Sequence, residues 1–235
     1  MIIQNVVYLL RTYFKSSFWF LPCLLFFLFL CLNYSYKPNP VADSYSVTAV
    51  FLFFIACWVG RGVCHAEHPE QRAISLTHTP HRWQYYLSEW LTAVAIISML
   101  AILTVLFPVF MGVLERFPSS IEWLIAITGH IALGILGSSL ALLTQRSFIH
   151  KTNYGFSILA IWSFSGLLHK KLLTGLPESV YFIKWILPPV LPLTEQMMTA
   201  DSVESVLGLS FYAVTYAFIL VLLYIFFSAM KKDVL

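Results

Sequence analysis

Hydrophobic residues along this chain gather into long continuous runs rather than alternating with polar positions. Such runs suit α-helices that cross a bilayer, because a crossing helix needs ~20 apolar residues to span ~30 Å of hydrocarbon. A membrane β-barrel would show short alternating segments instead. The runs predict six transmembrane helices, at about residues 18–34, 45–64, 90–114, 121–144, 154–168 and 207–230. We therefore expect an all-α integral membrane protein.

The first part of the chain has a different pattern, with apolar residues at three-to-four spacing and polar residues between them. This spacing predicts an amphipathic helix over residues 1–16 that lies in the membrane interface, with Arg11 and Lys15 among the lipid headgroups. A cleaved signal peptide would show small residues after its apolar run, whereas this run ends in CLNYSYKPNP. We expect the amphipathic helix to be retained.

A polar segment, HAEHPEQRAISLTHTPHRWQYYLSE at residues 65–89, separates the second and third apolar runs. Pro69 suits the first turn of a helix, where its missing N–H has no acceptor to lose. We therefore predict a short helix from Pro69 to about Thr77. Thr79 and Pro80 then predict the N-cap and the first residue of the following helix.

Composition agrees with a membrane protein, because 59% of the residues are hydrophobic and 11% are charged, against about 25% charged in soluble domains. The distribution of Lys and Arg predicts the orientation, since cytoplasmic loops are enriched in them. With the first residues inside, nine lie on the inner side: Arg11, Lys15, Arg61, Arg72, Arg82, Arg146, Lys151, Lys231 and Lys232. Five lie outside: Lys37, Arg116, Lys170, Lys171 and Lys184. We expect both termini and the polar segment to face the cytoplasm.

Histidines in the polar segment form two H-x-x-H pairs, which have the residue types of zinc ligands. The pairs are His65 with His68, and His78 with His81. Histidines are also common on a solvated surface, and a proline interrupts the second pair. We predict no metal site.

Polar residues within the predicted spans are candidates for function. His130 and Ser138 lie roughly 12 Å apart by helix rise, too far for a nucleophile and its base. We predict no catalytic residue; His130 is either a satisfied structural histidine or a functional group. Arg61 and Glu89 fall at a similar depth, and we expect a structural pair between them.

The polar segment resembles the coupling helix of ABC transporter permeases of the ABC-2 type. Between spans two and three, those permeases carry an acidic residue, a Leu further along, then a Pro, an Arg and an aromatic-Leu pair. The resemblance implies that residues 65–89 dock into an ATPase subunit. The expected coupling residues are Glu67, Glu70, Arg72, Ile74, Leu76, Pro80, Arg82 and Tyr85.

A second resemblance lies in residues 169–205, ahead of the last predicted span. The stretch PESVYFIKWILPPVLPLTEQMMTA is too short to cross a membrane, and its prolines interrupt a helix. ABC-2 permeases have a proline, an amphipathic turn and a Pro-Leu-Thr cluster at this place, which form short re-entrant external helices. The matching residues are Pro177, Trp185, Pro189 and Pro192.

The resemblance implies a single transmembrane permease domain over residues 1–235 and ATP-driven export. Members of the family often move antimicrobial peptides, drugs, lipids or polysaccharides, and we favour a hydrophobic or amphipathic substrate such as an antimicrobial peptide, for export or immunity. The chain contains no G-x-x-x-x-G-K-[ST] motif, so ATP and Mg would be bound by a separate ATPase subunit. We do not expect the chain to be an enzyme or to bind a cofactor itself.

Further partners implied by the resemblance are a second permease, identical or homologous, and membrane lipid, without nucleic acid. The implied location is the plasma membrane of a bacterium. Two other classes of function stay open from the residues alone: a membrane sensor or regulatory subunit without transport activity, and an intramembrane enzyme.

Overall fold

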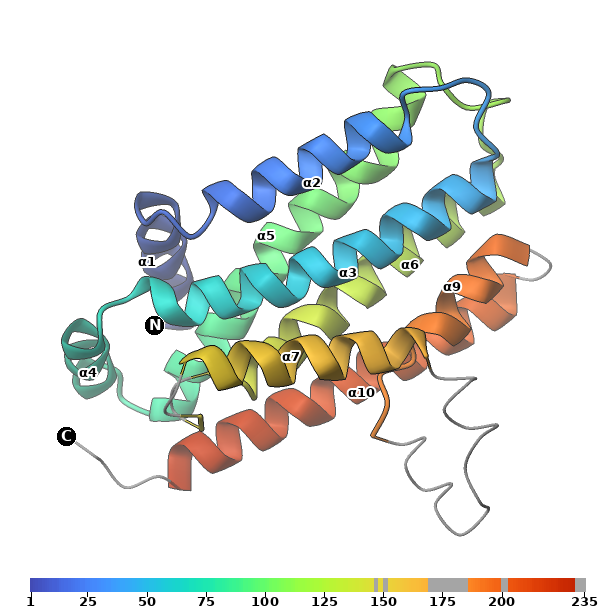
Figure 1. Ribbon diagram of the computed structural model, residues 1–235. Coiled ribbons are helices and arrows are strands. Elements are labelled where there is room, and N and C mark those ends of the chain that lie inside the picture. Colours follow the sequence, from blue (N-terminus) through green and yellow to red (C-terminus); the bar gives the residue numbers. More distant parts are fainter. Residues whose placement is uncertain (146–147, 150–151, 169–185, 200–202, 231–235) are drawn as a thin grey trace, which may run out of the picture.

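A computed structural model describes residues 1–145, 148–149, 152–168, 186–199 and 203–230. Within these residues the chain is helical, with an isolated bridge between Asn39 and Leu114. The helices are α1 (Ile2–Lys15), α2 (Phe20–Asn33), α3 (Val41–Ala66), α4 (Pro69–His78), α5 (Arg82–Phe110), α6 (Ser120–Leu142), α7 (Thr152–Leu167), α9 (Val190–Thr199) and α10 (Val203–Met230). The long helices run side by side, whereas α1 and α4 lie at one end of the bundle (Figure 1).

Four of the described helices, α3, α5, α6 and α10, are long and apolar enough to cross a membrane. The pair α1 and α2 is bent by 77° and counts as a fifth candidate if it is one broken span. The 14 residues of α2 and the 16 of α7 reach about 21 Å and 24 Å, short of the ~30 Å hydrocarbon layer. The chain is thus a multi-pass helical membrane protein, and six spans stay a prediction.

The outer faces of α2, α7 and α10 carry many exposed large hydrophobic side chains. On α10 they include Phe211, Phe218, Phe226 and Phe227. Apolar side chains that face outward while polar groups such as His130 and Thr48 are buried match a protein whose surroundings are hydrocarbon.

The helix that follows the polar segment begins two residues later than predicted. The sequence interpretation placed its N-cap at Thr79 and its first residue at Pro80, with the apolar span from about residue 90, but α5 begins at Arg82 with His81 as its N-cap. The Thr79 hydroxyl instead donates to the Ser75 carbonyl at 2.8 Å and closes α4. The physical reason is Pro80, because the residue before a proline avoids the helical region.

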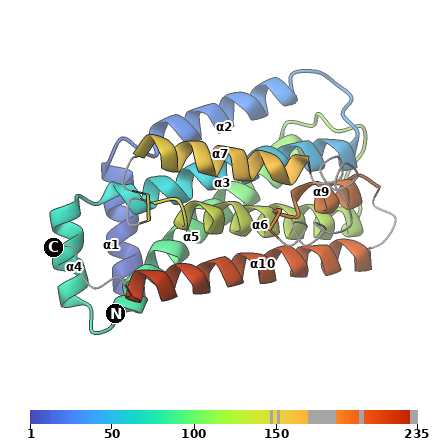
Figure 2. The same cartoon turned by 60° about the horizontal axis from the view of Figure 1, so that its bottom comes forward.

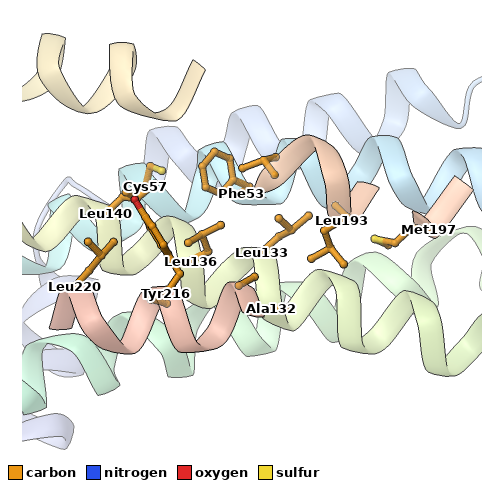
Figure 3. Close-up of a cluster of buried hydrophobic side chains, with 14 of the residues drawn as sticks. Phe53, Cys57, Ala132, Leu133, Leu136, Leu140, Leu193, Met197, Tyr216 and Leu220 are labelled. Carbon is orange, nitrogen blue, oxygen red and sulfur yellow. The ribbon is translucent and has the colours of Figure 1, made fainter. Parts of the chain in front are cut away.

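Close packing of α3 on α6 depends on glycines. A Cβ at Gly137 would lie 2.4 Å from the Phe53 carbonyl oxygen, and one at Gly60 would lie 2.9 Å from the Ser138 carbonyl oxygen. Small residues at both crossings let the backbones approach, as is common between membrane helices. Figure 3 shows Phe53 of α3 and Leu133 and Leu136 of α6 in the core that this approach creates.

The short helix α9 lies against α3, α6 and α10 rather than on the surface, and Leu193 and Met197 are buried in the core (Figure 3). A Cβ at Gly129 would lie 2.4 Å from the Met197 Sδ, so α9 sits directly on α6. Pro189 precedes α9, and Pro192 lies in its first turn, where backbone N–H groups have no intrahelical acceptor. These prolines therefore lie at the start of a helix and do not interrupt one. Of the other predicted residues of this region, Pro177 and Trp185 lie outside the described residues.

Candidate docking site around helix α4

Helix α4 forms where the sequence predicts it, from Pro69 to His78, with Pro69 in the first turn. Extended backbone at Glu67 and Thr79 sets it apart from α3 and α5. Figure 2 shows α4 beyond the end of the bundle, near α1 and the last turns of α10. One side of α4 therefore faces the bundle and the other faces outward.

A carboxylate cluster holds α4 and α1 to the bundle. Glu67, which is buried, accepts hydrogen bonds from Tyr8 of α1 at 2.8 Å, Ser75 of α4 at 2.6 Å, and Tyr85 of α5. Gln71 of α4 donates to the Tyr8 hydroxyl at 2.6 Å. Burial, followed by the hydrogen bond with Glu67, raises the pKa of Tyr8, so its hydroxyl stays a donor. Glu67 thus joins three helices.

An ion pair anchors the middle of α4. The Arg72 guanidinium lies 3.0 Å from a carboxylate oxygen of Glu89, donates to the Gln145 Oε1 at 3.1 Å, and lies 5.7 Å from the centre of the Tyr85 ring. The Tyr224 hydroxyl of α10 donates to the other Glu89 oxygen. Burial is the largest single influence and acts to lower the pKa of Arg72, but Glu89 together with Tyr224, Tyr85 and Cys64 holds that pKa above its ordinary value. Arg72 therefore remains a cation.

Together these contacts tie one short helix to four distant parts of the chain. Arg72 and Glu89 are 17 residues apart, and Arg72 and Tyr224 are 152 apart. A charged group this poorly exposed is costly to bury unless its partners are in place. Helix α4 is consequently held in one defined position against α1, α5, α10 and the segment after α6.

The eight predicted coupling residues fall into two groups. The first group faces the bundle and is buried or half-buried: Glu67, Arg72, Leu76 and Tyr85. The second group is exposed: Glu70, Ile74, Pro80 and Arg82. Ile74 is 58% exposed, and Trp83, which sequence reasoning did not single out, is 43% exposed. Among the predicted coupling residues, the second group is thus the one on the exposed surface, where Trp83 also lies.

The predicted pair of Arg61 with Glu89 is replaced by the pair of Arg72 with Glu89. The Arg61 guanidinium instead donates to the Thr144 carbonyl. It also passes within 2.9 Å of the position that a Cβ on Gly155 of α7 would take. Depth in the membrane, which suggested the pairing, does not specify the direction in which a side chain leaves its helix.

Sequence reasoning also missed three residues of this network: Tyr8, Gln145 and Tyr224. A signal was present for Tyr224, because a tyrosine inside an apolar run usually has a hydrogen-bond partner when buried. Nothing in the sequence identified that partner as Glu89.

His130 lies completely buried between α6 and α3. Its Nδ1 is 2.7 Å from the Ala126 carbonyl oxygen, and its Nε2 is 3.1 Å from the Thr48 hydroxyl. The Ser138 hydroxyl donates to the Ile135 carbonyl and not to His130. Both ring nitrogens are thus engaged, which favours a structural histidine that ties the two helices together.

The two H-x-x-H pairs gain no third ligand in the described part of the chain, where no three His, Cys, Asp or Glu side chains gather closely enough to hold a metal ion. No protein-family model matches the chain, and no curated protein matches it significantly. A functional assignment therefore depends on the residues and geometry of the chain itself.

Proposed function

We propose that this chain is the permease subunit of an ATP-driven exporter of the ABC-2 type, in which α4 is the coupling helix. A separate ATPase subunit binds ATP and Mg and contacts the outward side of α4. Two permeases, identical or homologous, form the pathway in a bacterial plasma membrane. The substrate is hydrophobic or amphipathic, with an antimicrobial peptide as the favoured class.

In this proposal α2, α3, α5, α6, α7 and α10 are the six spans, and α1 lies in the interface. The lengths of α2 and α7 are compatible with crossing where the bilayer thins locally. Both termini, α1 and α4 face the cytoplasm, because Lys and Arg predominate there.

The main support for the proposal is that α4 has one side fixed to the bundle and one side exposed. Its inward side is fixed to α5 and α10 by Arg72, to α1 by Gln71, and to Glu67 at the end of α3 by Ser75, so a displacement of α4 acts on those helices and not on a flexible loop. Energy transfer further requires that each conformational state contact the ATPase differently. A short rigid helix outside the bundle can meet that requirement.

The outward side of α4 has the chemistry of an anchor point. Ile74 is an exposed apolar side chain on a polar helix, with Glu70 one turn before it. An exposed apolar side chain among polar residues suits a pocket on a protein partner, where such anchors dominate the binding energy.

Ile74→Asp tests the proposal directly. The tagged chain is purified with candidate nucleotide-binding subunits, and capture and permease-stimulated ATP hydrolysis are measured. We expect Ile74→Asp to weaken capture about thirtyfold, as for loss of an interface anchor worth about 2 kcal/mol. Phe117→Asp is the matched control, because Phe117 is exposed in the loop between α5 and α6.

Capture should be unchanged in Phe117→Asp. If the wild-type chain captures no nucleotide-binding subunit, or if Ile74→Asp captures it as well as wild type does, the proposed function is wrong.

A further inference from the structure

Helix α1 lies across the bundle rather than along it. It is bent by 77° relative to α2, which runs with the long helices (Figures 1 and 2). Its inward side is buried through Leu9 and Tyr13, and a Cβ on Gly62 would lie 3.0 Å from the Tyr13 ring. An amphipathic helix held at this angle at one end of a membrane bundle lies in the plane of the bilayer surface.

The outward side of α1 is divided into an apolar and a basic part. Ile3, Val7 and Phe14 are exposed and lie on one flank at helical spacing. Arg11 and Lys15, also exposed, lie four residues apart on the other flank. Neither basic residue forms an ion pair with a described residue.

The charge of this surface identifies its partner. The sequence has no acidic residue before Asp43, so α1 presents positive charge beside apolar side chains. Apolar side chains enter the boundary between headgroups and acyl chains, while adjacent Lys and Arg bind anionic headgroups at about 1 kcal/mol each. The fitting partner is a bilayer surface that contains anionic phospholipid.

Tyr8 connects this surface to α4. Its hydroxyl donates a hydrogen bond to Glu67 and accepts one from Gln71 of α4. We propose that α1 binds anionic phospholipid headgroups through Arg11 and Lys15, and that this binding steadies α4 through Tyr8. The proposal goes beyond the transport function and does not depend on it, because it requires a membrane but no ATPase.

Amide hydrogen exchange of the full chain in nanodiscs tests the proposal. The discs contain phosphatidylcholine alone, or phosphatidylcholine mixed with phosphatidylglycerol. We expect anionic lipid to slow exchange in α1 and α4 by up to about thirtyfold, given two basic contacts of about 1 kcal/mol each. High salt should remove the difference, because it screens exposed charges.

Three variants separate the two parts of the proposal. The double variant Arg11→Gln with Lys15→Gln should lose the lipid dependence in both helices. Tyr8→Phe should keep it in α1 and lose it in α4. Lys37→Gln is the matched control, because it removes an exposed basic residue from the loop between α2 and α3, and it should respond as wild type does.

Exchange in α1 that is equal in the two bilayers, or a double variant that responds as wild type does, overturns lipid binding. A lipid response of α4 that persists in Tyr8→Phe overturns the connection. If exchange is independent of lipid while the double variant loses capture of a nucleotide-binding subunit in neutral discs, the basic residues contact protein and the proposal is likewise overturned.

Discussion

The two ends of the bundle each contain an Arg–Glu pair, but the pairs differ in what they connect. At the α4 end, Arg72 and Glu89 have side chains 15% and 1% exposed and join two helices. At the other end, Arg116 is 55% exposed and pairs with Glu122, six residues further along the chain. The first pair links two separate helices, α4 and α5. The second pair links the loop before α6 to the first turn of α6.

The local pair helps to begin a helix. Glu122 also accepts from the Ser119 backbone N–H at 2.8 Å, and the Ser119 hydroxyl accepts from the Glu122 N–H, which together form the capping box of α6. The hydrogen bonds with Glu122 raise the pKa of Arg116. Glu122 is buried, but Arg116 is more than half exposed, so solvent screens this pair; a pair buried on both sides depends strongly on both partners. In the part of the chain that the structure describes, the Arg72–Glu89 pair thus holds one helix against another, whereas the Arg116–Glu122 pair acts locally at the start of α6.

Arg72→Ala should have the largest effect on this contrast, because it leaves Glu89 buried without its cation. Loss of one partner of a buried ion pair costs about 3–5 kcal/mol. We expect the free energy of unfolding, measured by SDS titration, to fall by about 3 kcal/mol.

The double variant Arg72→Met with Glu89→Leu is the control for this prediction, because it removes both charges and keeps apolar volume. It should recover most of the lost stability. An Arg72→Ala protein that unfolds at the same SDS concentration as wild type would show that Glu89 does not depend on Arg72.

Tyr224→Phe should have an intermediate effect. It keeps the aromatic ring packed on Tyr86, at 5.4 Å between ring centres, but removes the hydroxyl that donates to Glu89. A hydrogen bond to a charged acceptor contributes about 2 kcal/mol. We therefore expect the free energy of unfolding, measured by SDS titration, to fall by about that amount.

Tyr216→Phe is the matched variant on the same helix, because the Tyr216 hydroxyl donates to the neutral carbonyl of Ile186 at 2.6 Å. Its cost should be about 1 kcal/mol. If Tyr216→Phe proves more destabilising than Tyr224→Phe, the charge of Glu89 is not the source of the difference.

Arg116→Gln should have the smallest effect. The side chain is mostly in solvent, and Ser119 still caps α6 without it. We expect the SDS midpoint to stay at the wild-type value, at low salt as well as high. A loss as large as that of Arg72→Ala would abolish the contrast between the two ends.

Sequence patterns predicted the existence of most helices and misplaced several of their ends. Long apolar runs located α3, α6 and α10 within a few residues, because crossing a membrane imposes length and composition together. The start of α5 was predicted two residues too early, at Pro80. The apolar run identified α5 only from about residue 90, roughly two turns inside the helix, since its polar first residues are protected by neighbouring helices rather than by lipid. Pro69 correctly marked the start of α4, because its effect is local.

The candidate site was predictable as a segment but not as an arrangement. The sequence identified α4 and its charged residues, yet assigned Glu89 to Arg61. The observed partner is decided by the side from which each residue leaves its helix and by how the helices cross. No local signal encodes that choice.

What the amino-acid sequence alone determined is a helical membrane protein with a short polar helix, because periodicity, hydrophobic length and proline geometry act over a few neighbouring residues. Only the tertiary structure decided that this helix meets both Tyr8 of α1 and Tyr224 of α10. The reason is that such meetings depend on close approaches between helices, such as those at Gly60 and Gly137, and these are properties of the packed bundle.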